Sequence, residues 1–363
     1  MKHSALLTAL AAAALPLSAV QADSMLFPYI VTSNTVASII SVVNKDQSNE
    51  LFLNYFTKDS LANTASCTDQ LRRRFTSNFN DLVSFEVNGT FQGDVATANG
   101  GPLFNDPAGA TTYGGVNFTM GPLSVPRRAF LIVDDNDNNG EDLYGEAMFL
   151  ETQGGAAWGY RGYNAATDFG QTGGNYPEFD AIPDQGPGSI NSSTNDNLGE
   201  VLDEQNNTDT AAVTLLPTDE WVTNFFVTPI NTGDQRLCTN CNAAIKLTRD
   251  KSENALGLFD RDSNPLTGSN IVDVICVSGV NLEELLPSNV QATIAQQGGW
   301  GYVNVDAGSA GNNPVPGAVV LKLEFNKIET DFISPDTANS FIGTVNTAVW
   351  LRNRDNSEGV SGF

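Results

Sequence analysis

Residues 129–150 read AFLIV-DDNDNNGEDLYGE-AMFL, two short apolar runs on either side of the acidic stretch 134–146. The acidic stretch holds six carboxylates in thirteen residues. The apolar runs are rich in β-branched and aromatic residues and too short for the two helices of an EF-hand, so they predict strand, loop and strand. Short strand-like runs separated by polar turns continue along the chain. This pattern predicts an all-β fold.

The acidic stretch has the residue spacing of a calcium loop. From Asp135 it follows the pattern D-x-[DN]-x-[DN]-G-x5-E, in which alternate oxygen side chains converge on one ion and a final glutamate closes the shell. The predicted ligands are the side chains of Asp135, Asp137, Asn139 and Glu146 and the backbone carbonyl of Glu141. The likeness to an EF-hand covers this ligand chemistry only, because Asp142 stands where an EF-hand usually has an aliphatic residue. The alternative is a solvated hairpin turn, and calcium is the only cofactor that the sequence suggests.

The first 22 residues, MKHSALLTALAAAALPLSAVQA, have the charged start, apolar centre and small-residue end of a secretory signal. Cleavage after Ala22 is expected, so the mature chain is predicted to be secreted, extracellular or on the cell surface. Loss of Lys2 changes the formal net charge from −24 to −24 − 1 = −25. So acidic a chain disfavours nucleic acid as a partner and favours cations or basic surfaces. No later run is long enough for a transmembrane helix.

Histidine chemistry is excluded from the mature chain, because the only histidine is His3 in the predicted signal. A Ser-His-Asp triad, a Cys-His pair and a histidine-ligated zinc are therefore ruled out. Glycoside hydrolysis by two carboxylic acids remains open, but two acids among 42 carry no information. The sequence predicts a protein that is not an enzyme.

The four cysteines, Cys67, Cys238, Cys241 and Cys276, are expected to form disulfides in an exported chain. Three pairings are open from sequence alone. Cys67–Cys276 with Cys238–Cys241 is the preferred one. A redox role for the Cys238–Cys241 motif is disfavoured, because such motifs open a helix in a βαβ setting that this sequence lacks.

Several stretches give specific predictions of local structure. Leu26–Val31 and Val36–Val43 flank a short polar turn and predict a β-hairpin. Residues 319–325 alternate as a half-exposed strand would. Asn281 followed by Glu284 predicts a capped short helix near Leu282–Leu286, which Pro287 would end.

Two surface features have both an ordinary and a functional interpretation. Arg72, Arg73 and Arg74 either pair with nearby carboxylates or receive an acidic patch of a neighbouring subunit. Aromatic residues between glycines either belong to the core or form a sugar-stacking face: Trp158, Tyr160, Trp300 and Tyr302.

The predicted fold is one or two antiparallel β-sandwiches, Ig-like or jelly-roll-like, with long Gly/Asn/Asp-rich loops and a short helix. The expected division is a signal at 1–22, a β-sandwich unit with the acidic loop at 23–163, a linker or surface insertion at 164–210, and a second β-rich unit at 211–363. The predicted function is a secreted or cell-surface structural or interaction protein, such as a coat, adhesin-like or filament component. Its partners would be other surface proteins, copies of itself or carbohydrate. The alternative is a carbohydrate-binding module or an acid-pair glycoside hydrolase.

Overall fold

The computed structural model describes most of the predicted strands. The described residues are 24–32, 36–45, 50–58, 60, 62–67, 69–77, 80–87, 127–134, 143–151, 157–165, 200–203, 210–230, 237, 239–250, 255–311, 313–315, 317–326 and 347–349. They are mostly strand, in several antiparallel sheets with few helices, so the all-β prediction is confirmed.

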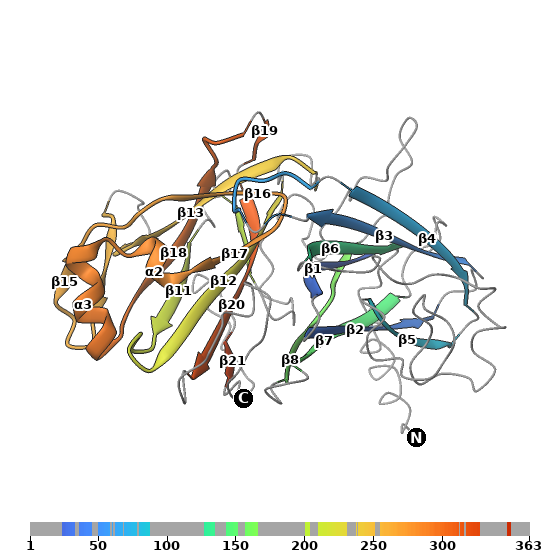
Figure 1. The fold of residues 1–363 in the computed structure, drawn as a ribbon, viewed down its shortest axis with the longest axis horizontal. Helices are drawn as coiled ribbons and strands as arrows, with labels where there is room; N and C mark the ends of the chain where they lie inside the picture. Colours follow the sequence, from blue (N-terminus) through green and yellow to red (C-terminus); the bar gives the residue numbers. More distant parts are fainter. Residues whose placement is uncertain are drawn as a thin grey trace, which may run out of the picture.

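Two sheets are built from residues 24–165, here called the N-terminal unit (Figure 1). The first, sheet A, has the strand order β4 (Asp69–Thr76), β3 (Glu50–Lys58), β6 (Arg127–Asp134), β1 (Ser24–Thr32) and β9 (Tyr163–Ala165). The second, sheet B, has the order β5 (Leu82–Glu86), β2 (Val36–Asn44), β7 (Leu143–Glu151) and β8 (Ala157–Arg161).

Two further sheets are built from residues 200–349, here called the C-terminal unit. Sheet C has the order β10 (Glu200–Asp203), β20 (Gly317–Asn326), β12 (Trp221–Ile230) and β17 (Ser278–Asn281), and β21 (Thr347–Val349) also pairs with β20. Sheet D has the order β15 (Pro265–Thr267), β14 (Gly257–Asp260), β18 (Gly299–Ala307), β13 (Cys241–Thr248) and β16 (Val272–Ile275). In addition, β11 (Thr210–Leu215) pairs with β18 and β19 (Asn313–Pro314) with β13.

Consecutive strands of the N-terminal unit often lie in opposite sheets. The strands predicted at residues 26–43 are present, but the hairpin prediction is wrong, because β1 pairs with β6 and β9 whereas β2 pairs with β5 and β7. The strands around the acidic stretch behave in the same way, since β6 lies in sheet A and β7 in sheet B. Here a short polar turn between two apolar runs marks a crossing between sheets. A hairpin would have the same local sequence pattern, so the sequence alone does not distinguish the two.

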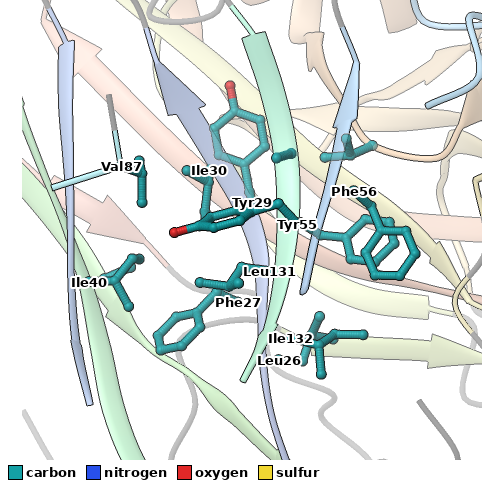
Figure 2. Packing of buried hydrophobic residues seen from close by; sticks show 14 of the residues in the cluster. Leu26, Phe27, Tyr29, Ile30, Ile40, Tyr55, Phe56, Val87, Leu131 and Ile132 are labelled. Atoms are coloured by element: carbon teal, nitrogen blue, oxygen red, sulfur yellow. The ribbon is translucent and has the colours of Figure 1, made fainter. Parts of the chain in front are cut away.

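The two sheets of the N-terminal unit pack closely, and glycine permits the approach. A Cβ atom at Gly145 of β7 would lie 2.8 Å from Met25 Sδ and 2.9 Å from Phe27 Cζ on β1. Figure 2 shows buried aromatic and branched side chains from several strands of the N-terminal unit, among them Phe27, Ile40 and Leu131. The side chains of Met25 to Val31, other than Pro28, are all buried in one cluster that also includes residues of the C-terminal unit.

Sheet C is buried on both faces. Successive residues of β12 alternate between two core clusters, since Phe225 packs in the core of the C-terminal unit and Phe226 in the core shared with the N-terminal unit. Strand β20 alternates in the same way, so the prediction of a half-exposed strand there is wrong. The reason is tertiary, because the core of the C-terminal unit covers the face of Val320, Lys322 and Glu324 that the sequence pattern would leave to solvent.

The predicted short helix is confirmed as α2 (Leu282–Leu285). The Asn281 side chain accepts from the Glu283 backbone N–H at 2.8 Å, and the Glu284 side chain accepts from the Asn281 N–H at 3.0 Å. A second helix, α3 (Ser288–Gln297), was not predicted from the sequence. Its usable signals were Pro287 just before it and Gly298 just after it.

The range 164–210, expected to be a linker or insertion, contains short strand segments. It includes the end of β9, all of β10 and the first residue of β11. β10 pairs with β20 through only four residues, Glu200–Asp203. So short a strand in a polar stretch offers too few residues for a recognisable alternation.

Candidate functional site

The predicted calcium loop is only partly visible. Asp135, Asp137, Asn139 and Glu141 lie outside the described residues. Glu146 lies within β7, pairs in register with Ser41 and Arg161, and is exposed. Leu143 and Ala147 lie on the opposite face of the same strand and are buried, so Glu146 lies on the outer face of sheet B. Among the residues that the structure describes, no group of three or more acidic, cysteine or histidine residues could hold a metal.

The arginine run lies on the same sheet as the start of the acidic stretch. β4 is an edge of the described sheet A, and in register Arg74 pairs with Phe52, which pairs with Asp134. Two strand spacings separate the backbones of Arg74 and Asp134, roughly 10 Å. The backbone therefore places the arginine run two strands away from the start of the acidic stretch within one molecule.

Trp158 and Tyr160 are core residues, which corrects their interpretation as a sugar-stacking face. Only 8% of Trp158 and 3% of Tyr160 is exposed. The Trp158 ring stacks on Phe149 at 4.1 Å and on Phe226 of the C-terminal unit at 5.4 Å. The ring faces that a sugar would need are covered by other aromatic rings.

The Tyr160 hydroxyl is satisfied inside this core. It accepts from the Tyr29 backbone N–H at 3.1 Å and donates to the Tyr29 carbonyl. Burial raises the pKa of the Tyr160 phenol well above its usual value, and the hydrogen bond to Tyr29 opposes this only in part. The phenol is neutral at physiological pH, and its role is structural.

Trp300 and Tyr302 lie on the outer face of sheet D and are half-buried. The alternate residues Gly299 and Gly301 face the core, where a Cβ would meet Leu258. The Trp300 ring stacks on Phe259 of the neighbouring strand, with 4.6 Å between ring centroids. These two aromatic residues stay available at the surface, although Phe259 covers one face of Trp300.

The preferred disulfide is present. Cys67 and Cys276 are bonded, with a Cα–Cα distance of 5.7 Å, and they join the N-terminal unit to the C-terminal unit. Cys241 is disulfide-bonded as well, and no cysteine among the described residues is free. Its predicted partner, Cys238, lies outside the part of the chain that the structure describes.

The polar half of the boundary between the units surrounds this disulfide. The Lys58 ammonium, fully buried at the end of β3, donates to the backbone carbonyls of Ile275 at 3.3 Å and Val277 at 3.0 Å. Arg128 of β6 donates to the Ser278 hydroxyl at 2.8 Å, and that hydroxyl donates to Asn63 at 2.7 Å. Side chains of the N-terminal unit therefore hold both sides of the Cys276 backbone.

The chain makes a strained turn at Cys276. The φ angle of Cys276 is +64°, in the left-handed region, and the Val277 N–H donates to the Ile275 carbonyl at 2.9 Å. A three-residue turn of this kind is rare because it is strained. It carries the chain from β16 in sheet D to β17 in sheet C. The disulfide and the Lys58 contacts hold this conformation in place.

The apolar half of the boundary is an aromatic stack. The Phe226 ring of β12 lies 4.0 Å from the Tyr29 ring of β1, and the Thr228 hydroxyl donates to the Pro28 carbonyl at 2.5 Å. The contacts between the two units are here called the seam. On the side of the N-terminal unit they are made by Lys58, Asn63, Cys67, Arg128, Tyr29 and Trp158. Sequence analysis found only the disulfide, because the other members become adjacent only when distant strands pack.

Two ion pairs among the described residues of the C-terminal unit involve a buried lysine. The Lys322 ammonium and the Glu324 carboxylate are both buried and lie 2.9 Å apart. Burial lowers the pKa of Lys322, and the charge of Glu324 opposes that change. Glu324 also accepts from the Thr223 hydroxyl and the Leu216 backbone N–H, both at 3.1 Å. Lys246 and Asp306 form the second pair, on the outer face of sheet D. The first pair lies within strand β20, and the second joins the adjacent strands β13 and β18.

No family model, curated protein or solved structure matches the chain. Among the described helices, none is long and apolar enough to cross a membrane.

Proposed function

We propose that this chain is a secreted or cell-surface structural or interaction protein, of the coat, adhesin-like or extracellular filament kind. The seam is the observation that carries the proposal. A protein that binds by closing two domains keeps its domain boundary mobile and polar. Here a disulfide, a fully buried lysine and a shared aromatic core fix the two units together. Such a boundary suits a protein that holds its shape.

Export and charge support the same proposal. The predicted signal and the disulfide fit an oxidising compartment. A net charge of −24 keeps single chains apart and makes divalent cations natural cross-linking or stabilising ions. In this proposal the acidic loop binds calcium, both units are of the Ig-like or jelly-roll-like kind, and the partners are copies of the chain or other surface proteins.

The experiment follows the native protein to its location and state of assembly. Protease treatment and antibody labelling of intact cells should reach the chain, and gentle extraction should release it as assemblies or bound to surface proteins. Recovery of the chain inside the cytoplasm would overturn the proposal.

The second candidate is a carbohydrate-binding module or an acid-pair glycoside hydrolase. The partial accessibility of Trp300 and Tyr302 is the observation that favours it. A glycan array with the wild type and with Trp300→Ala separates the two candidates. Glycan binding that the Trp300→Ala substitution removes would favour the second candidate, and binding to surface proteins alone would favour the first.

A further inference from the structure

The outer face of sheet D carries an amine and an amide in direct cross-strand register. Lys246 of β13 pairs with Asn304 of β18. Their chain neighbours Ile245, Leu247, Val303 and Val305 belong to the core, so Lys246 and Asn304 share the opposite face. That face is not open to solvent at this point, because Lys246 is 6% exposed and Asn304 0%.

A carboxylate completes the group. Asp306 lies two residues after Asn304 on the same face of β18, and its Oδ2 contacts Lys246 Nζ in an ion pair. Directly opposed residues of an antiparallel pair have Cβ atoms about 5 Å apart, a distance that a lysine side chain can span. The Lys246 nitrogen, the Asn304 side-chain carbon and a proton-relaying carboxylate are therefore within mutual reach.

We propose that Lys246 and Asn304 form an intramolecular isopeptide bond, with Asp306 as the proton relay. A lysine amine shielded from water is a nucleophile once it loses its proton, and Asp306 is placed to accept that proton. The Lys246 Nζ–Asn304 Cγ bond forms and the Asn304 Cγ–Nδ2 bond breaks. Two hydrogens of the lysine ammonium pass through Asp306 to Nδ2, which leaves as ammonium. No atom changes oxidation state, and Asp306 returns to its carboxylate form.

The ion pair of Lys322 and Glu324 shows what the Lys246 group has in addition. Lys322 also contacts a carboxylate, Glu324, and is buried. Its partners in register are Phe225 and Val349, neither of which has an acyl group for an amine to attack. Lys322 is therefore the matched control within the same chain.

The bond would join two adjacent strands that are far apart in the sequence, and so would add covalent continuity within the C-terminal unit. The inference goes beyond the proposed function and does not depend on it. Intact mass reports only on the bond, whereas location and assembly report only on the function.

The test is the intact mass of the purified, signal-cleaved full chain after reduction of its disulfides. The expected mass is lower than the sequence mass by about 17 Da, the mass of the ammonia that is lost. Protease digestion should yield one branched peptide that contains both Lys246 and Asn304. Lys246→Arg and Asp306→Ala should restore the sequence mass, and Lys322→Arg should keep the loss.

A wild-type chain at its full sequence mass, without a branched peptide, would overturn the inference. So would a loss of the same size that persists in Lys246→Arg, because it would come from cyclisation at another asparagine. Persistence of the branched peptide in Asp306→Ala would remove Asp306 from the reaction. Peptide mapping of the wild type decides the matter even if a variant fails to fold.

Discussion

Lys58 is an unusual residue to find at the centre of a boundary. It ends a strand whose residues 53–58 are all buried, and its ammonium is held by backbone carbonyls from both units. A buried cation is costly unless its hydrogens are matched to acceptors. Lys58 can therefore be tolerated only when the C-terminal unit is docked, so its burial couples the stability of β3 to the seam.

Replacement of Lys58 by methionine should lower the free energy of unfolding by about 3 kcal/mol, because buried carbonyls lose their donor. Urea denaturation followed by fluorescence measures the change. Lys45→Met is the control, since Lys45 contacts Asn80 at the exposed end of β2. It should change stability by no more than about 0.5 kcal/mol. Equal effects from the two substitutions would contradict the role given to Lys58.

Tyr160 gives a prediction that depends on pH. Tyr160→Phe should cost about 2 kcal/mol at neutral pH, because the Tyr29 N–H and carbonyl both lose a partner. The folded pKa of Tyr160 is raised by burial, so between the unfolded and folded values only the unfolded chain releases this proton. Its contribution is complete below about pH 10 and declines as the pH rises above it.

Urea midpoints at neutral and alkaline pH check this sign. The difference between wild type and Tyr160→Phe should narrow as the pH rises above about 10. A difference that stays constant or widens would mean that Tyr160 ionises as easily in the folded protein as in the unfolded one.

At the scale of elements, the short helix α2 shows a local signal that tertiary structure preserved. The capping box of Asn281 and Glu284 satisfies backbone N–H groups at the start of a four-residue helix. Leu282 and Leu285 bury the other side in the core of the C-terminal unit. Capping and burial agree here, so the sequence was sufficient to predict the helix.

Asn281→Ala should lower stability by about 1 kcal/mol, the usual cost of losing an N-cap. Asn281→Asp should recover most of the loss, because the carboxylate still accepts from the Glu283 N–H. Thermal denaturation of the three proteins measures both effects. An aspartate variant as unstable as the alanine variant would mean that the contact of Asn281 with Asn224 matters more than the cap.

The loop between β6 and β7 connects two sheets, which gives its proposed calcium a structural role. An ion bound there would tie the end of sheet A to the start of sheet B and would turn repelling carboxylates into ligands. At ten-fold excess over the dissociation constant, calcium should add about 1.4 kcal/mol to stability. The melting temperature should then rise by a few degrees.

Melting curves in excess calcium and in excess chelator test the site. Asp137→Ala and Glu146→Gln should each remove the calcium-dependent rise and leave the chelator baseline nearly unchanged. Asp262→Ala is the control, because Asp262 lies outside the loop and its side chain is 64% exposed. Identical curves with calcium and chelator would show that the loop is an ordinary solvated connection.

For the whole molecule, the seam connects the N-terminal and C-terminal units through a disulfide and a shared core. Sheet C serves two cores at once, one with sheet D and one with the N-terminal unit. A strand with both faces buried cannot lose one partner without exposing apolar side chains to water. The two units should therefore unfold together in a single transition.

Removal of the seam should separate that transition into two. The disulfide closes a sequence separation of 209 residues, for which chain entropy predicts a contribution of about 5 kcal/mol. The combination Cys67→Ala, Cys276→Ala and Phe226→Ala should give two calorimetric transitions in place of one. Phe225→Ala with the same cysteine changes is the control, because Phe225 lies wholly in the core of the C-terminal unit. A single transition in the Phe226 triple variant would contradict the coupling.

Most of the longer strands, the capped helix and the all-β class could be predicted from the sequence, and Cys67–Cys276 belonged to the preferred one of three open pairings. Strand alternation and capping depend on residues within a few positions of each other, so the local sequence is enough to predict them. That the cysteines are bonded followed from the cysteine count and the expected compartment, whereas the sequence left three pairings open. The α3 helix was missed because only its flanking proline and glycine marked it.

The tertiary structure alone decided which sheet each strand joins, and with it the candidate sites. The sequences of β1 and β2 would show the same pattern whether these strands formed a hairpin or lay in different sheets. Alternation indicates which face of a strand is apolar but not which element covers it. For the same reason Trp158 could have been a surface platform, and β20 a half-exposed strand. Lys58 and Phe226, and in our proposal the pair of Lys246 and Asn304, have roles that depend on contacts between strands far apart in the sequence. Such long-range packing is not encoded in any short window of the chain.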